Sequence, residues 1–194
     1  LTLIEYAAFF GSIQIFKYLI YQDVDLQSSI WLYAIHSNNP ELIKLLEDYH
    51  IDPPDDSFDS CFIESIKCHH HSISQYILDN YMLEKKLGFY EWLNNIIIHY
   101  NFIELSNFFN EDDFDIINWP QVNDVTKNII FYDFCKYNYF RICEFLAQYS
   151  NVDIVYVGND YHSTTVLICA TEASNYDIIQ LLFSTFENMN INHV

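Results

Sequence analysis

The strongest constraint on how this chain folds is a match between its first two segments. Residues 2–26, TLIEYAAFFGSIQIFKYLIYQDVDL, align without a gap on residues 29–52, SIWLYAIHSNNPELIKLLEDYHID. The offset is 27 residues at every aligned position, so that Ala7 falls on Ala34. Self-similarity at a fixed period of about 20–50 residues is the signature of repeat proteins. The first part of the chain is therefore predicted to repeat one small structural unit.

Four later segments carry the same pattern. They are CFIESIKCHHHSISQYIL, WLNNIIIHYNFIELSNFF, NIIFYDFCKYNYFRICEFL and TTVLICATEASNYDIIQLL, which place Ser65, Ile97, Phe134 and Ala170 at the position of Ala7. We predict one repeat array over residues 1–194, with approximate copies at 1–27, 28–56, 57–88, 89–122, 123–160 and 161–194.

Each copy reads as two short helices with a break between them. Apolar residues spaced three and four apart mark the helices. The breaks hold Gly11, Asn38–Asn39, His69–His70, Asn101, Asn138 and Ser174–Asn175. A helix often ends on a residue in the left-handed conformation, which Gly adopts best and Asn next best. Asn is therefore expected to replace Gly at these breaks, in a chain that has only three glycines.

The second helix has its clearest start in the second copy. There Asn39 is a suitable cap, Pro40 fits the first helical position and Glu41 favours the positive end of the helix dipole. Helices this short are marginally stable alone, so each pair is expected to stack on the next. Three Gly and four Pro are too few for an all-β fold with its many turns. The expected fold class is all-α, a helical solenoid of about six stacked helix-turn-helix repeats.

The first and last copies resemble an ankyrin repeat, whose pattern is T-P-L-H-x-A in a unit of about 33 residues. The residues that match this pattern, with Glu5 in the place of its His, are Thr2, Ile4, Glu5, Ala7, Gly11, Thr165, Leu167 and Ala170. The resemblance implies an ankyrin-like solenoid. The first half of the chain also resembles the domain that precedes ankyrin repeats in a large protein family of unicellular parasites.

The ankyrin resemblance also implies a binding surface. Ankyrin repeats bind proteins through the exposed end of each first helix, on the concave face, and through nearby loops. The matching positions are Phe9, Phe10, His36, Ser37, Lys67, Cys68, His99, Tyr100, Lys136, Tyr137, Glu172 and Ala173. Several are aromatic, a residue class that dominates binding hot spots. The alternative is that these aromatic residues pack against the next helix or are scattered surface residues.

The chain is strongly acidic, with a net charge of −19. Such a charge repels nucleic acids and anionic membrane surfaces, and it attracts proteins with basic patches. The acidic stretches DPPDDSFD and EDDFD lie between helix pairs and are expected to form solvated loops. The alternative role of the acidity is to keep an aromatic-rich chain soluble.

The sequence shows no motif of a catalytic or nucleotide-binding site. We therefore predict no enzyme activity, no catalytic residue and no cofactor. The one cluster of metal-ligand residue types comprises Cys68, His69, His70 and His71, with Cys61 upstream. Cys61 and Cys68 lie two helical turns apart, about 10.5 Å, which is too far to share a zinc ion. A metal-binding protein is a remote alternative.

The predicted function is a non-catalytic protein–protein interaction module with a concave aromatic strip and acidic loops. The alternative is a structural spacer or an N-terminal capping segment of a longer ankyrin array, with self-association through exposed array ends. It is suggested by a chain that starts inside a helical pattern, as a fragment would. Five cysteines among apolar residues indicate reduced thiols and an intracellular, cytoplasmic protein. The sequence has no run of about 18 apolar residues, so no transmembrane helix is expected.

Overall fold

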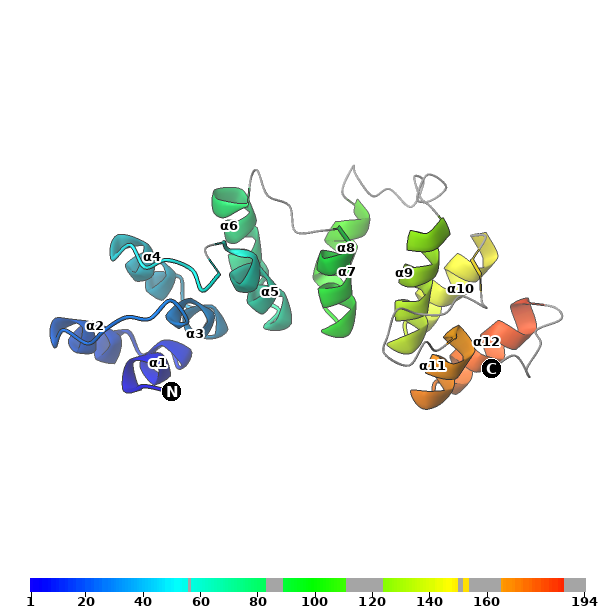
Figure 1. Ribbon diagram of the computed structural model, residues 1–194, viewed down its shortest axis with the longest axis horizontal. Helices are drawn as coiled ribbons and strands as arrows, with labels where there is room; N and C mark the ends of the chain where they lie inside the picture. The colour runs from blue at the N-terminus through cyan, green and yellow to red at the C-terminus, as the bar shows by residue number, and fades with distance from the viewer. Residues whose placement is uncertain (56, 83–88, 111–123, 150–151, 154–164, 187–194) are drawn as a thin grey trace. The chain divides into compact units, whose positions relative to one another are not determined.

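The computed structural model describes residues 1–55, 57–82, 89–110, 124–149, 152–153 and 165–186. The predicted all-α class is confirmed, because the regular elements of these residues are helices (Figure 1). They are α1 (Leu3–Phe9), α2 (Ile13–Tyr21), α3 (Ile30–His36), α4 (Pro40–Asp48), α5 (Asp59–Lys67), α6 (His71–Tyr81), α7 (Phe89–Ile98), α8 (Phe102–Asn110), α9 (Asp124–Lys136), α10 (Phe140–Tyr149), α11 (Val166–Glu172) and α12 (Tyr176–Thr185). None of the helices in these residues combines the length and the apolar character that crossing a bilayer requires.

The chain forms two compact units, Leu1–Ser106 and Asn107–Val194. In the first unit the odd-numbered helices pack in succession, since α1 contacts α3, α3 contacts α5 and α5 contacts α7. Each of α1, α3 and α5 also packs against the helix that follows it. In the second unit α9 contacts α10 and α11, and α12 contacts the same two helices. Each unit is thus built from helix pairs. The single array over both units stays a prediction.

The turn inside each pair has the same backbone geometry. One residue has a positive φ, and these residues with their φ values are Gly11 (65°), Asn38 (53°), His69 (59°), Tyr100 (53°), Asn138 (60°) and Ser174 (57°). In five of the six turns the next N–H donates to the carbonyl five residues earlier, as from Ser12 to Ala7 at 2.8 Å. This Schellman closure satisfies carbonyls that the helix end would otherwise leave without partners.

The prediction for the fourth turn is wrong by one residue. The left-handed residue is Tyr100, and Asn101 follows it. The N–H of Asn101 donates to Ile96 O at 3.1 Å, so Ile96, not Ile97, stands at the position of Ala7. Among the six turns that the structure describes, Asn fills the left-handed position only in the second and fifth. The first turn has Gly11, and the other three have His69, Tyr100 and Ser174 in a conformation that non-glycine residues adopt rarely.

Local capping fixes where the short helices begin. The predicted start of α4 is confirmed, because Asn39 Oδ1 accepts a hydrogen bond from Glu41 N at 3.0 Å and Pro40 occupies the first turn. α1 begins with a capping box, in which Thr2 N donates to Glu5 Oε2 at 2.7 Å and the Thr2 side chain accepts from Glu5 N. These bonds satisfy N–H groups that every helix start exposes.

Small residues occupy the buried faces of the first helices. Ala8, Ala34 and Ala170 are fully buried. Ser65 takes the same place in α5, because its hydroxyl donates to Phe62 O at 2.6 Å and so keeps a partner when buried. Four of the five cysteines are buried and all five are free thiols, in keeping with their apolar sequence surroundings.

Candidate functional site

The predicted binding residues lie at the C-terminal ends of the first helices. In the first unit these ends belong to α1, α3, α5 and α7, which pack in succession. One of the two predicted residues at each end is exposed, and these four are Phe10, His36, Lys67 and Tyr100. We call these four residues the first-helix row. Their half-buried neighbours are Phe9, Ser37, Cys68 and His99.

Ring contacts connect the first two members of the row. The Phe9 ring stacks on the His36 ring with centroids 4.1 Å apart, and it meets the Phe10 ring edge-on at 5.1 Å. Phe10 itself is 70% exposed. Phe9 packs against a residue of the next pair, whereas Phe10 projects into solvent.

The third and fourth ends are neutral or weakly basic. Lys67 Nζ lies 3.5 Å from Glu64 Oε2, a surface pair that contributes little energy. Burial, together with the Lys67 ammonium, lowers the pKa of His99, so this imidazole is neutral near pH 7. Burial and the Glu64 carboxylate raise the pKa of Cys68 to about 11. The thiol therefore keeps its proton and is a poor nucleophile.

The second unit holds the other four predicted residues. Lys136 ends α9 and Tyr137 follows it, while Glu172 ends α11 and Ala173 follows it. Lys136 Nζ lies 5.8 Å from the ring centre of Tyr132 and 5.9 Å from that of Tyr137, within cation–π range. Glu172 and Ala173 are exposed. These residues form a separate candidate surface within their own unit.

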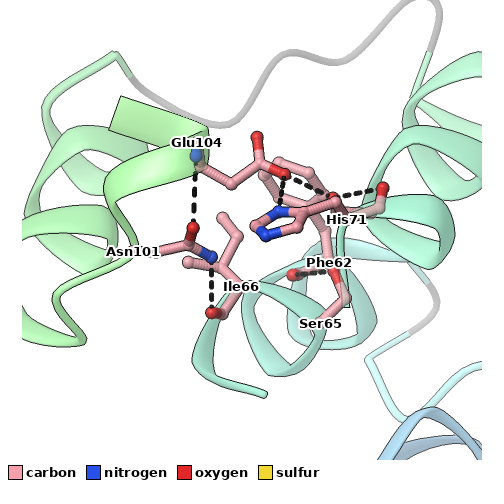
Figure 2. A network of polar contacts seen from close by, with 7 residues as sticks. Phe62, Ser65, Ile66, His71, Asn101 and Glu104 are labelled. Atoms are coloured by element: carbon pink, nitrogen blue, oxygen red, sulfur yellow. Dashed lines mark hydrogen bonds and ion pairs between the residues drawn. The ribbon is translucent and has the colours of Figure 1, made fainter. Parts of the chain in front are cut away.

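A buried polar network joins the third and fourth pairs (Figure 2). Asn101 Nδ2 donates to Ile66 O at 2.9 Å, and Asn101 Oδ1 accepts from Glu104 N at 3.1 Å. The Asn101 side chain is fully buried. One amide therefore binds the end of α5 and caps the start of α8.

The Glu104 carboxylate belongs to the same network. Its Oε1 accepts from Ser74 Oγ at 2.8 Å and lies 3.0 Å from His71 Nδ1. A catalytic Ser–His–acid triad needs the hydroxyl against the imidazole, whereas here both groups meet the carboxylate. Ser74 is also only 1% exposed. The arrangement holds α6 to α8 and does not activate a nucleophile.

The residues of the candidate metal cluster turn to different partners. Cys68 Sγ lies 3.7 Å from Glu64 Oε1, and His70 Nε2 lies 3.2 Å from His36 O. His71 belongs to the network of Figure 2, and the remaining histidine is the exposed left-handed residue of the α5–α6 turn. Within the described ranges of the chain, no three His, Cys, Asp or Glu side chains gather where they would hold a metal ion.

Sequence reasoning missed a groove between α4 and α6. Its volume is about 610 Å³, and Ile43, Lys44, Glu47 and Tyr76 are among the residues that line it. Glu47 Oε1 accepts hydrogen bonds from Tyr76 Oη at 2.6 Å and from Tyr81 Oη at 2.5 Å. The bond to Glu47 and burial raise the pKa of Tyr76. No pattern along one helix marks a groove that two helices share.

Comparison with known proteins finds no matching protein-family model, no matching curated protein and no matching solved structure. A function for this chain therefore has to be argued from the residues and contacts described above.

Proposed function

We propose that this chain is a non-catalytic protein–protein interaction module on an ankyrin-type scaffold. The observation that supports the proposal is the first-helix row, whose four exposed side chains lie at the C-terminal ends of helices that pack in succession or within two residues after them. Helices packed in this way hold the row at fixed spacing, which lowers the entropy lost on binding.

The two aromatic members are the main contact residues of the proposed surface. Phe10 is 70% and Tyr100 is 48% exposed. A large aromatic side chain buries much apolar area at low conformational cost, so it often dominates an interface. The backbone at Tyr100 has a φ of 53° in the turn that follows α7.

The proposed partner is a protein with an apolar patch for the row and basic patches for the acidic remainder of the chain. The net charge of −19 favours such a partner and speeds its approach. Of the two predicted acidic loops, 111–115 lies outside the described residues. In the other, hydrogen bonds from Ser60 lower the pKa of Asp55, although its partial burial alone would raise it, so this carboxylate stays charged. We place the protein inside the cell, in the cytoplasm.

The proposal is tested by affinity capture from the protein's own cell extract with two matched variants. The row variant is His36→Ala with Tyr100→Asn, because Asn tolerates the left-handed backbone. The control is Tyr49→Ala with His50→Asn, which removes the same residue types from exposed positions and also changes a left-handed residue, His50 (φ 53°). Circular dichroism and urea unfolding check that both variants fold.

The row is expected to carry binding. Proteins that the wild-type chain and the control capture should be lost from the row variant, and the charge-driven part of binding should weaken as salt is raised. If the row variant captures the same proteins at the same salt concentrations as the control, the row is not the binding surface.

A structural spacer or N-terminal capping segment is the second candidate function. It is favoured by the exposed apolar residues on α1 and α2, such as Leu3 and Tyr18. A metal-binding function is not favoured, because the side chains of the candidate cluster engage separate partners.

A further inference from the structure

The first helix pair exposes a set of apolar side chains. These residues, with their exposed fractions, are Leu3 (66%) and Tyr6 (48%) on α1, Phe10 (70%) directly after α1, and Ile15 (50%) and Tyr18 (63%) on α2. We call these five residues the terminal face. They recur three to four residues apart on each helix, the spacing of a face that packs against a neighbour.

The same positions are covered in the second pair. The residues 27 positions later are Ile30, Tyr33, Ser37, Leu42 and Leu45. Ile30 and Leu42 are fully buried, and the other three are half-buried. The second pair differs from the first in having a pair before it, since α3 contacts α1. The terminal face is therefore the counterpart of a surface that this chain already buries.

Specific contacts join the first helix pair, α1–α2, to the second, α3–α4. Ser29 Oγ donates to Glu5 Oε1 at 3.1 Å, and Lys17 Nζ lies 2.5 Å from Glu41 Oε1. At the turn, the nearest atoms to a side chain added at Gly11 would be those of Ser37 and Asn39, at 3.6 Å. The two pairs thus meet along the helices and at the turn.

A hydrogen bond between turns recurs from pair to pair. The side chain after the left-handed residue reaches a carbonyl at the end of the preceding first helix. The bonds are Asn39 to Gly11 O (3.5 Å), His70 to His36 O (3.2 Å), Asn101 to Ile66 O (2.9 Å) and, in the second unit, Asn175 to Cys135 O (3.0 Å). In the first pair this position holds Ser12, whose hydroxyl makes no hydrogen bond to the start of α2. Ser12 is thus placed to donate to a preceding turn.

The terminal face carries no charged side chain in a chain of net charge −19. Gln14 stands where the second pair has Glu41, the residue that binds Lys17 across the junction. An amide there accepts a neutral or a charged neighbour equally well. The terminal face itself therefore places no carboxylate against an incoming segment.

We propose that the terminal face is a docking site for one further antiparallel helix pair of the same kind as those in this chain. The partner pair would present small apolar residues on its first helix, as α1 presents Ala7 and Ala8, and a turn carbonyl to the Ser12 hydroxyl. Apolar burial along Leu3, Ile15 and Tyr18 supplies the driving force. The terminal face shares only Phe10 with the first-helix row, and the docking rests on Leu3, Ile15 and Tyr18, which lie outside that row.

The test uses the full chain with a second copy of residues 2–28 inserted directly before Thr2. This insertion repeats the 27-residue spacing of the first two pairs and offers the terminal face a helix pair of known surface. We expect the amides of the inserted helices to exchange at least about 10-fold more slowly than an unstructured segment does. The urea midpoint of the first unit should rise.

A matched control carries Ile15→Glu and Tyr18→Glu in the original copy of the duplicated chain. The same two changes in the unduplicated chain should leave the urea midpoint unchanged, because both side chains are exposed there. In the duplicated chain they should abolish the slow exchange of the inserted helices and return the midpoint to that of the parent.

Two results would overturn the proposal. The first is an inserted copy that exchanges as fast as an unstructured segment. The second is a wild-type chain that dimerises by light scattering and becomes monomeric with Ile15→Glu and Tyr18→Glu, since the face would then belong to a second copy. The terminal face and the first-helix row share Phe10, but the capture test changes His36 and Tyr100, and this test changes Ile15 and Tyr18. Failures of the two proposals are therefore distinguishable.

Discussion

In the first unit, two junctions between helix pairs use the same two kinds of hydrogen bond. The junctions differ in how deeply these bonds are buried. In the outer junction, between α1–α2 and α3–α4, Asn39 donates to Gly11 O at 3.5 Å and Glu5 accepts from a serine hydroxyl at 3.1 Å. In the inner junction, between α5–α6 and α7–α8, Asn101 donates to a turn carbonyl at 2.9 Å and Glu104 accepts from a serine hydroxyl at 2.8 Å. Asn101 and Glu104 are buried, whereas Asn39 and Glu5 are partly exposed.

The two junctions differ in burial rather than in bonding pattern, and burial is expected to set how much each contact contributes to the free energy of unfolding. A partner lost at the outer junction is replaced by water. A partner lost at the inner junction leaves a buried polar group without a hydrogen bond, which costs about 1–3 kcal/mol per group. Removing the amide of Asn101 should therefore lower the free energy of unfolding more than removing the equivalent hydrogen bond of Asn39.

Asn101→Ala is expected to have the largest effect. It removes the donor to Ile66 O and the cap of Glu104 N, so the free energy of unfolding should fall by about 2–4 kcal/mol. Urea unfolding followed by Trp fluorescence measures the loss. Ser106→Ala on the exposed side of α8 is the control and should change stability by less than about 0.5 kcal/mol. A loss at Asn101 no larger than at Ser106 would refute the role of burial.

The Glu104–His71 pair should show the next largest effect. In a double-mutant cycle of Glu104→Ala and His71→Ala, we expect a coupling energy of about 1–2 kcal/mol, because the two side chains meet at 3.0 Å in a mostly buried site. Unfolding free energies of the two single variants and the double variant give the coupling. Additive single effects would show that the contact contributes nothing of its own.

Asn39→Ala should cost about 1 kcal/mol, mainly through loss of the cap on Glu41 N. Asn39→Asp separates the two roles, because it keeps the capping oxygen and removes the donor to Gly11 O. We expect Asn39→Asp to lie within about 0.5 kcal/mol of wild type in urea unfolding. If Asn39→Asp lowers the free energy of unfolding as much as Asn39→Ala does, the hydrogen bond to Gly11 O stabilises the fold more than its length and exposure suggest.

The ion pair between Lys17 and Glu41 is expected to contribute less than about 0.5 kcal/mol, because both side chains are about half exposed. Glu41→Gln measured at low and at high salt checks this value. A large loss of stability in Glu41→Gln that persists at high salt would contradict this small contribution.

The smallest effect concerns pH. Hydrogen bonds from Thr2 lower the pKa of Glu5 below its ordinary value of 4.5. A lowered folded-state pKa means that the stabilisation is present above pH 4.5 and is lost as the pH falls through the lowered value. Because Glu5 is partly exposed and its hydrogen bonds with Thr2 are screened by solvent, the contribution should stay below about 0.5 kcal/mol. Glu5→Gln should flatten the acid side of the stability profile slightly, and an unchanged profile would remove this contribution.

Much of the fold could be predicted from local features of the sequence. Helix pairing followed from apolar spacing, and the cap at Asn39 followed from the Asn-Pro-Glu sequence. The turn at Tyr100 was misplaced because residue preference favours Asn in the left-handed position. In the structure Tyr100 takes that position, and the buried Asn101 side chain bonds Ile66 O and Glu104 N. The stacking of pairs within each unit agrees with the expectation from short helices, while the ankyrin-type array remains a proposal.

The candidate site was only partly predictable. The ends of the first helices could be located from the repeat, but the exposed member of each end depends on how neighbouring helices cover it. Phe9 and Phe10 are adjacent and chemically identical, yet only Phe10 is exposed. The Glu104 network joins residues about 30 positions apart, from Ser74 and His71 to Glu104, and no local pattern connects them.

The most direct test of the account is native-state amide exchange at two equivalent turn N–H groups. Ser12 N donates to Ala7 O in the first turn, and Asn101 N donates to Ile96 O in the fourth. The backbone bonds are alike, but Ser12 is partly exposed and Asn101 is buried. The account predicts exchange at Asn101 at least about 10-fold slower than at Ser12 after correction for intrinsic rates. Equal protection at the two positions would contradict it.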